Sequence, residues 1–108
     1  MLKGGLWLRF HYKGIWYNGR IQALHQAGLV SIIVMVNQNG KWIKLVVLNT
    51  TLEGVNLGPN EFIAKTYPPE IKQLLDQFIE MGCLELTNRK AFGGSMGNLP
   101  VMKLSKAA

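Results

Sequence analysis

The feature that most constrains the fold is a run of apolar, mostly β-branched residues in the first half of the chain. Residues 29–36 read LVSIIVMV, a pattern typical of a strand that is covered on both faces. Residues 37–40 then supply turn residues, and residues 41–48, KWIKLVVL, return to the strand pattern. Two such strands joined by a short turn predict a central β-hairpin, so the chain should fold around antiparallel strands.

The N-terminal segment shows the alternation of a half-buried strand. A period of two separates its side chains into an apolar face, with Leu6, Leu8, Phe10 and Tyr12, and a polar face, with Trp7, Arg9, His11 and Lys13. The pair Lys13-Gly14 predicts a turn after this strand. Asn18-Gly19, between residues 15–17 and 20–24, predicts a second hairpin, because both residues tolerate positive φ.

The second half carries one clear helix. Pro68-Pro69 ends a predicted strand at residues 61–67, and a proline is well placed in the first turn of a helix. Gly82 is expected to cap its C-terminal end. The apolar stripe of this helix consists of Ile71, Leu74, Leu75, Phe78 and Ile79. Residues 49–60 are predicted to be a loop, and residues 83–87 and 99–104 to be strands, with Pro100 placing the last one at a sheet edge.

Together these elements predict an α+β fold in which an antiparallel sheet of about six or seven strands packs on one amphipathic helix. The 108 residues fit a single domain, residues 1–108. No stretch approaches the roughly 18 apolar residues of a membrane span, and no signal peptide is recognised. The one cysteine, Cys83, lies in an apolar run and is expected to be a buried thiol, which suits a reducing cytoplasm.

Charge is distributed unevenly along the chain. The formal net charge is +6, and the first 52 residues contain no acidic side chain. The cations of this half are Lys3, Arg9, Lys13, Arg20, Lys41 and Lys44. Such an imbalance is typical of a surface that meets nucleic acid or an acidic protein face, and a bias for solubility is the alternative.

The predicted partner-binding face combines the polar side of the first strand with basic and aromatic residues of later strands. It consists of Trp7, Arg9, His11, Lys13, Arg20, Trp42 and Lys44. Aromatic rings stack on bases while Lys and Arg contact phosphates, and Trp and Arg also anchor protein interfaces. The alternative is that the tryptophans belong to the core. Burial of all three is not expected, because Trp7 alternates with an apolar face that is already complete.

Groups that could support catalysis are few. Cys83 and the two histidines lack a spacing that favours a nucleophile with its base. Asp76 and Glu80 lie on the polar face of the helix, where solvated side chains are normal. Cys and His are too few for a zinc site, and the Gly-rich loop at residues 93–97 lacks the features of a phosphate-binding loop. We therefore expect no enzymatic activity, cofactor or metal.

A longer pattern runs through residues 17–104. It comprises YNGRIQAL, the NQNG turn, LGPNEFIAKTYPPEIKQLLDQFIEMGCLELTNRK and SMGNLPVMKL. This pattern resembles that of a family of short uncharacterised proteins carried on bacterial plasmids, conjugative elements and phages. The chain departs from it in a short second strand and in a Gly-Gly-Ser-Met-Gly insertion. The resemblance implies a mobile genetic element in a bacterial cytoplasm and supplies no catalytic residues.

Two functions follow as hypotheses. The first is a small inhibitor, of anti-CRISPR or anti-restriction type, that occupies the surface of a host defence protein or ribonucleoprotein complex. The alternative is a basic accessory protein of phage or plasmid maintenance that binds DNA or RNA electrostatically. A third possibility is a subunit of a larger assembly that pairs through an edge of the central hairpin or of the last strand.

Overall fold

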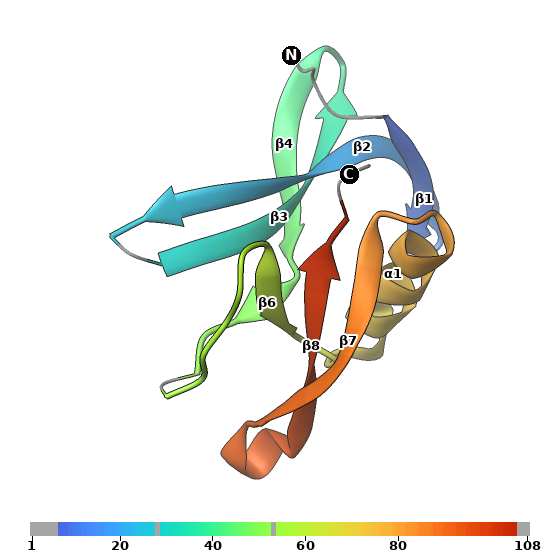
Figure 1. The fold of residues 1–108 in the computed structure, drawn as a ribbon. Helices are drawn as coiled ribbons and strands as arrows, with labels where there is room; N and C mark the ends of the chain where they lie inside the picture. Colours follow the sequence, from blue (N-terminus) through green and yellow to red (C-terminus); the bar gives the residue numbers. More distant parts are fainter. Residues whose placement is uncertain (1–6, 28, 53, 106–108) are drawn as a thin grey trace.

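Figure 1 shows the computed structural model of the chain, which describes residues 7–27, 29–52 and 54–105. Within these residues the chain forms eight strands, one α-helix and one 3₁₀ turn. Their order is β1 (Leu8–Tyr12), β2 (Ile15–Gln26), β3 (Leu29–Gln38), β4 (Lys41–Val47), β5 (Asn49–Thr50), β6 (Glu61–Ala64), α1 (Pro69–Glu80), β7 (Leu84–Phe92), η1 (Gly94–Met96) and β8 (Asn98–Leu104).

The strands form two antiparallel sheets. Sheet A has the order β1-β2-β3-β4, and sheet B has the order β5-β6-β8-β7. The predicted α+β class is confirmed. The prediction of one sheet of six or seven strands is wrong, because the chain leaves sheet A after β4 and starts the second sheet at once with β5.

The junction between the sheets is made by Leu48 and Asn49. The Leu48 N–H donates to the Ile32 carbonyl of β3 at 2.8 Å, and the Leu48 carbonyl accepts from the Lys65 N–H at 2.8 Å. The buried Asn49 side chain accepts from the Ile32 N–H and donates to the Val30 carbonyl, both at 2.8 Å. The predicted loop therefore begins with a short strand, because Asn49 and Thr50 pair with Ala64 and Ile63 of β6.

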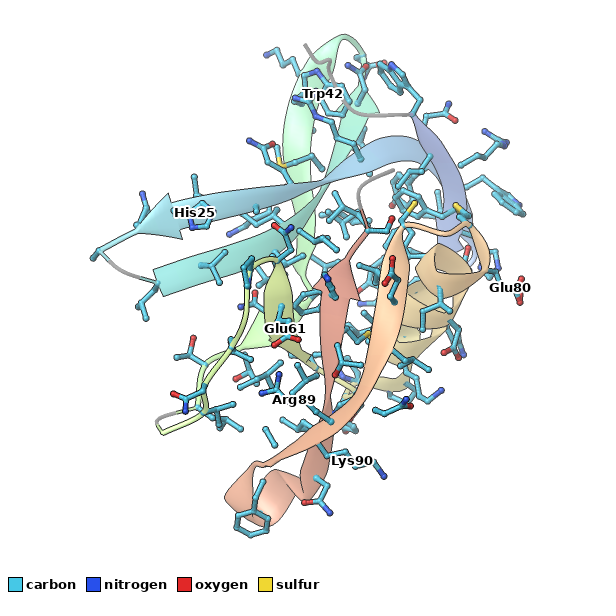
Figure 2. All side chains as sticks on the ribbon, in the orientation of Figure 1. His25, Trp42, Glu61, Glu80, Arg89 and Lys90 are labelled. Atoms are coloured by element: carbon cyan, nitrogen blue, oxygen red, sulfur yellow. The ribbon has the colours of Figure 1, made fainter. Side chains whose placement is uncertain are left out.

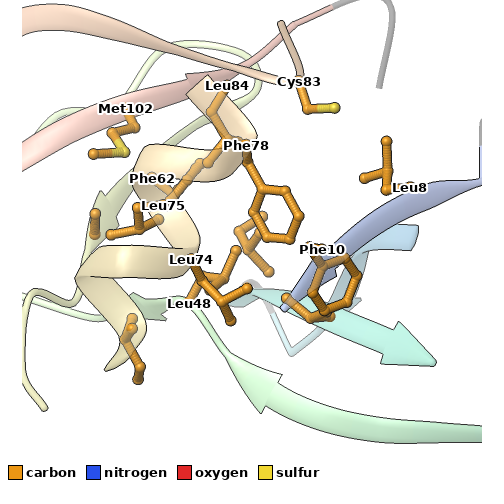
Figure 3. Close-up of a cluster of buried hydrophobic side chains, with 14 of the residues drawn as sticks. Leu8, Phe10, Leu48, Phe62, Leu74, Leu75, Phe78, Cys83, Leu84 and Met102 are labelled. Carbon is orange, nitrogen blue, oxygen red and sulfur yellow. The ribbon is translucent and has the colours of Figure 1, made fainter. Parts of the chain in front are cut away.

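A single main core lies between the inner face of sheet A, the helix and one face of sheet B (Figure 3). Its largest side chains come from all three parts: Phe10 and Val34 from sheet A, Phe78 from α1, and Phe62 and Leu84 from sheet B. The Phe10 and Phe78 rings meet edge to face at 5.2 Å. The layers thus share one interior and stabilise one another.

The helix agrees with the prediction. Pro69 occupies its first turn, and Gly82 follows its end at φ 81°. Cys83 is buried as expected, and burial raises the pKa of its thiol. None of the helices in the described residues is long and apolar enough to cross a membrane.

The turns were predicted with mixed success. Lys13-Gly14 joins β1 to β2, and Asn39-Gly40 joins β3 to β4, each with positive φ at both residues. The hairpin predicted at Asn18-Gly19 is wrong, because β2 runs unbroken from Ile15 to Gln26. At Gly19 the strand instead passes close to β3: a Cβ built there would lie 2.2 Å from the Met35 carbonyl oxygen. Glycine is required at this position by the close approach of two backbones.

The last strand, β8, does not lie at the sheet edge where it was predicted. β8 lies between β6 and β7, so it is an interior strand of sheet B. Pro100 is tolerated because the pairing of β6 with β8 covers only Val101–Lys103 and stops before the proline. The strand after the helix, β7, runs to Phe92 and pairs with β8 on its other side.

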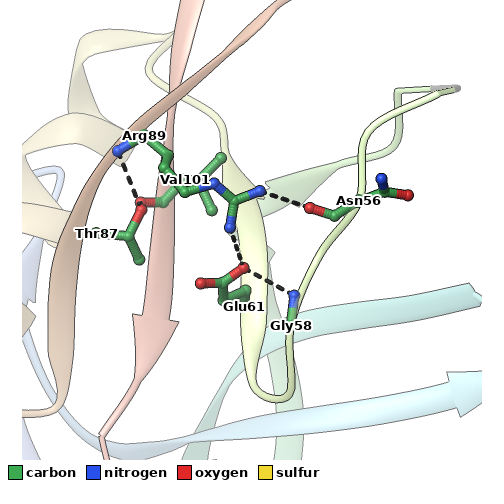
Figure 4. A network of polar contacts seen from close by, with 6 residues as sticks. All are labelled: Asn56, Gly58, Glu61, Thr87, Arg89 and Val101. Carbon is green, nitrogen blue, oxygen red and sulfur yellow. Dashed lines mark hydrogen bonds and ion pairs between the residues drawn. The ribbon is translucent and has the colours of Figure 1, made fainter.

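The loop between β5 and β6 covers the second face of sheet B, and one ion pair holds it in place. Leu52 and Val55 pack there on a small buried cluster that consists of Ile63, Ala91, Leu99 and Val101. The Glu61 carboxylate accepts from the Gly58 N–H at 2.8 Å and pairs with Arg89 at 2.6 Å, and Arg89 also donates to the Asn56 carbonyl (Figure 4). The Gly58 N–H and the Arg89 guanidinium hold the pKa of Glu61 below its usual value of 4.5.

This network makes a pH-dependent contribution to stability. Because the folded-state pKa of Glu61 is lowered, its contribution is complete above about pH 4.5 and is lost as the pH falls through the folded-state pKa. We expect Glu61→Gln to lower the melting temperature at pH 7, and the difference from the parent to shrink towards pH 3. Glu85→Gln, at an exposed position on β7, serves as the control. A difference that stayed constant with pH would contradict this role of the carboxylate.

Candidate functional site

The outer face of sheet A, which points away from the core, carries the predicted partner-binding residues. The register pairs Arg9 with Asn18, and Arg20 with Met35, which is paired in turn with Lys44. Directly opposed residues of antiparallel strands project from the same face. Arg9, Arg20 and Lys44 therefore lie on one face, as the sequence predicted, although a bulge interrupts the pairing of β3 with β4 next to Met35.

Two tryptophans meet across the width of this sheet. The rings of Trp7, just before β1, and Trp42 of β4 lie 5.0 Å apart at 38°. Trp7 precedes one edge strand of sheet A, β1, and Trp42 belongs to the other edge strand, β4. The guanidinium of Arg20, on the strand next to β1, stands 4.4 Å above the Trp42 ring. Figure 2 shows Trp42 near the turn that joins β3 to β4. The three side chains form a bridge that runs across the sheet.

A second cluster surrounds Trp16 on β2. The Arg9 guanidinium lies 5.3 Å from the centre of this ring, and the His11 ring meets it edge to face at 5.0 Å. Arg9 also donates to the Asn18 side chain at 3.3 Å. Trp16 was not among the predicted site residues. The two-residue turn at Lys13-Gly14 could have revealed it, because that turn places Trp16 directly opposite His11.

The tryptophans are not core residues. Trp7 is 62% exposed and Trp16 is 58% exposed, while Trp42 is half-buried under its two neighbours. The expectation that not all three would be buried is confirmed. Lys13 departs from the prediction: it belongs to the turn, at φ 52°, and its ammonium lies 5.5 Å above the Tyr12 ring. Leu6, expected on the apolar face of the first strand, lies outside the described residues.

The electrostatics of this face are one-sided. The strands of sheet A contain no Asp or Glu, because the acid-free half of the sequence forms the whole sheet. The ion pairs found among the described residues lie elsewhere, between Lys72 and Asp76 on the helix and between Glu61 and Arg89 in sheet B. Among the described residues, no carboxylate therefore forms an ion pair with Arg9, Arg20 or Lys44.

Comparison with protein-family models, with curated proteins and with solved structures finds no match for this chain. The resemblance to short proteins of plasmids, conjugative elements and phages stays a prediction.

The groups considered for catalysis are dispersed. His11 packs on Trp16, His25 lies near the far end of β2 (Figure 2), and Cys83 is in the core. Among the residues that the structure describes, no three His, Cys, Asp or Glu side chains gather as metal ligands would. The Gly-rich segment closes the β7–β8 hairpin with a 3₁₀ turn, and the Gly93 and Gly97 N–H groups bond within it.

The outer face of sheet A thus combines two kinds of chemistry. Exposed indole rings provide flat apolar surfaces on which a planar group can stack, and stacking on aromatic side chains is tolerant of base identity. The neighbouring guanidinium groups are always charged and donate in a geometry that matches phosphate oxygens. A face of this composition can hold a chain of planar, negatively charged units.

Proposed function

We propose that this chain is a non-enzymatic binding protein whose outer face of sheet A binds single-stranded nucleic acid. One observation supports this most directly. On a sheet without carboxylates, the exposed ring of Trp16 stands beside Arg9, and the exposed ring of Trp7 and the Arg20 guanidinium both lie against the ring of Trp42. Bases would stack on the indole rings while the arginines and Lys44 contact phosphates.

The geometry favours single strands over a duplex. Bases inside a duplex are already stacked on one another, so exposed indole rings gain stacking partners only from unpaired bases. Trp42 supports this arrangement without being the main platform, since Trp7 and Arg20 pack against its ring. The arginines are held by ring contacts beforehand, which lowers the entropic cost of ordering them on binding.

The second candidate is the counter-defence inhibitor expected from the sequence. The observation that favours it is the same set of exposed Trp and Arg side chains, which are also the usual anchors of protein interfaces. In this case the face would cover an acidic patch of a defence protein, or the guide RNA of a ribonucleoprotein complex. Both candidates assume that a mobile genetic element encodes this chain, and both use the same residues.

The test is a titration of labelled DNA and RNA oligonucleotides, followed by fluorescence anisotropy and by quenching of tryptophan emission. We expect single strands to bind more tightly than duplexes of the same length. We expect Trp16→Ala to weaken binding by about 5- to 150-fold, the equivalent of one stacked base. Absence of binding at low salt would exclude nucleic acid as the partner and leave a protein target as the remaining candidate.

A matched pair of variants separates stacking from simple loss of structure. Trp16→Phe keeps an aromatic ring and should retain most of the affinity that Trp16→Ala loses. Trp16 is 58% exposed, so neither change should disturb the core. If Trp16→Phe and Trp16→Ala bound single strands equally well, the ring would not be a stacking platform.

A further inference from the structure

Beyond β1 and β4, the strands β2 and β3 continue as a two-stranded arm, which extends to the left in Figure 1. Within the described residues, β1 pairs with β2 only as far as Gly19, whereas β2 pairs with β3 up to Gln26. The segment Ile21–His25 of β2 therefore has β3 on one side and no described strand on the other.

The backbone groups on that open side can be assigned from bonds on the opposite strand. Ile32 donates its N–H to Asn49 and accepts from the Leu48 N–H, so both of its backbone groups point away from β2. Ala23 is the residue opposite Ile32. In an antiparallel ladder, when the backbone groups of one residue point away from the partner strand, those of the residue directly opposite point outward as well. The N–H and carbonyl of Ala23 thus face the open side, and by alternation those of Ile21 and His25 do too.

Other edges of sheet A are blocked. The Gln77 side chain of α1 accepts from the His11 N–H at 3.0 Å and donates to the His11 carbonyl at 2.9 Å, which occupies the free edge of β1. Asn49 occupies the edge of β3 in the arm. β4 carries Lys41 and Lys44 beside a bulge, and both features oppose strand pairing. Among the residues that the structure describes, none provides such protection for the edge of β2 in the arm.

The arm also differs in charge from the rest of the molecule. Residues 21–40 contain no Asp, Glu, Lys or Arg, in a chain whose formal net charge is +6. Leu24 and Leu29 of the arm are 40% and 57% exposed. Two copies of a strongly basic chain repel each other over most surfaces, and an uncharged, partly apolar edge is where they can meet.

We propose that the edge of β2 at Ile21–His25 binds a second copy of this chain by antiparallel strand pairing. The two-fold axis passes beside Ala23, so Ala23 pairs with Ala23 of the second copy and Ile21 with its His25. This register uses every outward-facing backbone group of the segment, and such a contact is closed by symmetry. Directly opposed residues share a face, so the outer faces of both sheets would join into one surface.

Sedimentation of the protein alone, over a range of concentrations, tests this pairing. We expect the parent chain to approach twice its mass of 12.1 kDa as the concentration rises. Ala23→Lys and Ala23→Glu each place like charges opposite one another, so each should raise the dissociation constant of the dimer about tenfold or more. An equimolar mixture of the two variants should recover the dimer, because opposite charges then face each other across the axis.

The control is Ala23→Ser, a small uncharged change that should dimerise as the parent does. A parent chain that stays monomeric at all concentrations would overturn the proposal, and so would charged variants that dimerise as well as the parent. A monomer whose Ala23 amide is protected from hydrogen exchange would show that this edge is already covered within one chain, which also overturns the proposal. No nucleic acid is present, so the result is independent of the proposed function.

Discussion

Replacement of Gly19 by alanine is expected to lower the free energy of unfolding by about 2–3 kcal/mol. The added methyl group would lie 2.2 Å from the Met35 carbonyl oxygen and 3.1 Å from a methyl group of Val36. The nearest atom belongs to the backbone of the neighbouring strand, so a side-chain rotation cannot relieve the clash. β2 and β3 would have to separate at the point where β2 is also paired with β1. Denaturant titration followed by circular dichroism measures the loss.

Two further variants at this dipeptide make the result specific. Asn18→Ala removes one exposed side chain and a 3.3 Å bond from Arg9, and should change the stability by no more than about 0.5 kcal/mol. Gly19→Asn would be tolerated in a two-residue hairpin turn, where asparagine adopts positive φ. In a strand it meets the same carbonyl as alanine does. A Gly19→Asn variant as stable as the parent would contradict the unbroken course of β2.

This position also shows where sequence reasoning about the fold reached its limit. Asn18-Gly19 is a strong local turn signal, but Gly19 is paired with Leu8 on one side and with Val36 on the other. The energy of two strand pairings outweighs a local preference. Lys13-Gly14 and Asn39-Gly40 have no such competition and form turns as predicted.

The division into two sheets was hidden for a related reason. At the junction between the sheets, the Asn49 side chain bonds to the backbone of Ile32 and Val30, which lie 17 and 19 residues earlier in the chain. A single amide that bonds to a distant strand leaves no periodic pattern in the sequence. The helix and the first strand were predictable, because their apolar residues recur at the period of the element itself.

The candidate site was more accessible to prediction than the topology. A period of two assigns Arg9 and His11 to the face opposite Phe10, and the structure places Arg20 and Lys44 on that same face. The contact of Trp7 with Trp42 could not be predicted, because it depends on strand order. Trp16 was not predicted, because its position opposite His11 depends on the pairing register of β1 and β2.

The largest functional effect is expected from reversing three charges of the outer face, Arg9→Glu, Arg20→Glu and Lys44→Glu together. Each reversal changes the charge by two, so the formal net charge falls from +6 to zero. We expect single-stranded oligonucleotides to bind about 100-fold more weakly or not at all. Three lost phosphate contacts should also lower the slope of log affinity against log salt by about 2. Anisotropy titrations at several salt concentrations measure both quantities.

The matched control reverses Lys65, Lys72 and Lys90, which lie outside sheet A, and gives the same net charge. If affinity depended only on total charge, both triple variants would lose it equally, and the outer face would have no special role. Retention of most of the affinity in the control, together with its loss in the Arg9, Arg20 and Lys44 variant, would place the phosphate contacts on sheet A.

Equal binding by the parent and that variant would mean that nucleic acid, if bound, contacts another surface. The outer face would then be left to a protein partner, for which the exposed tryptophans are equally suited.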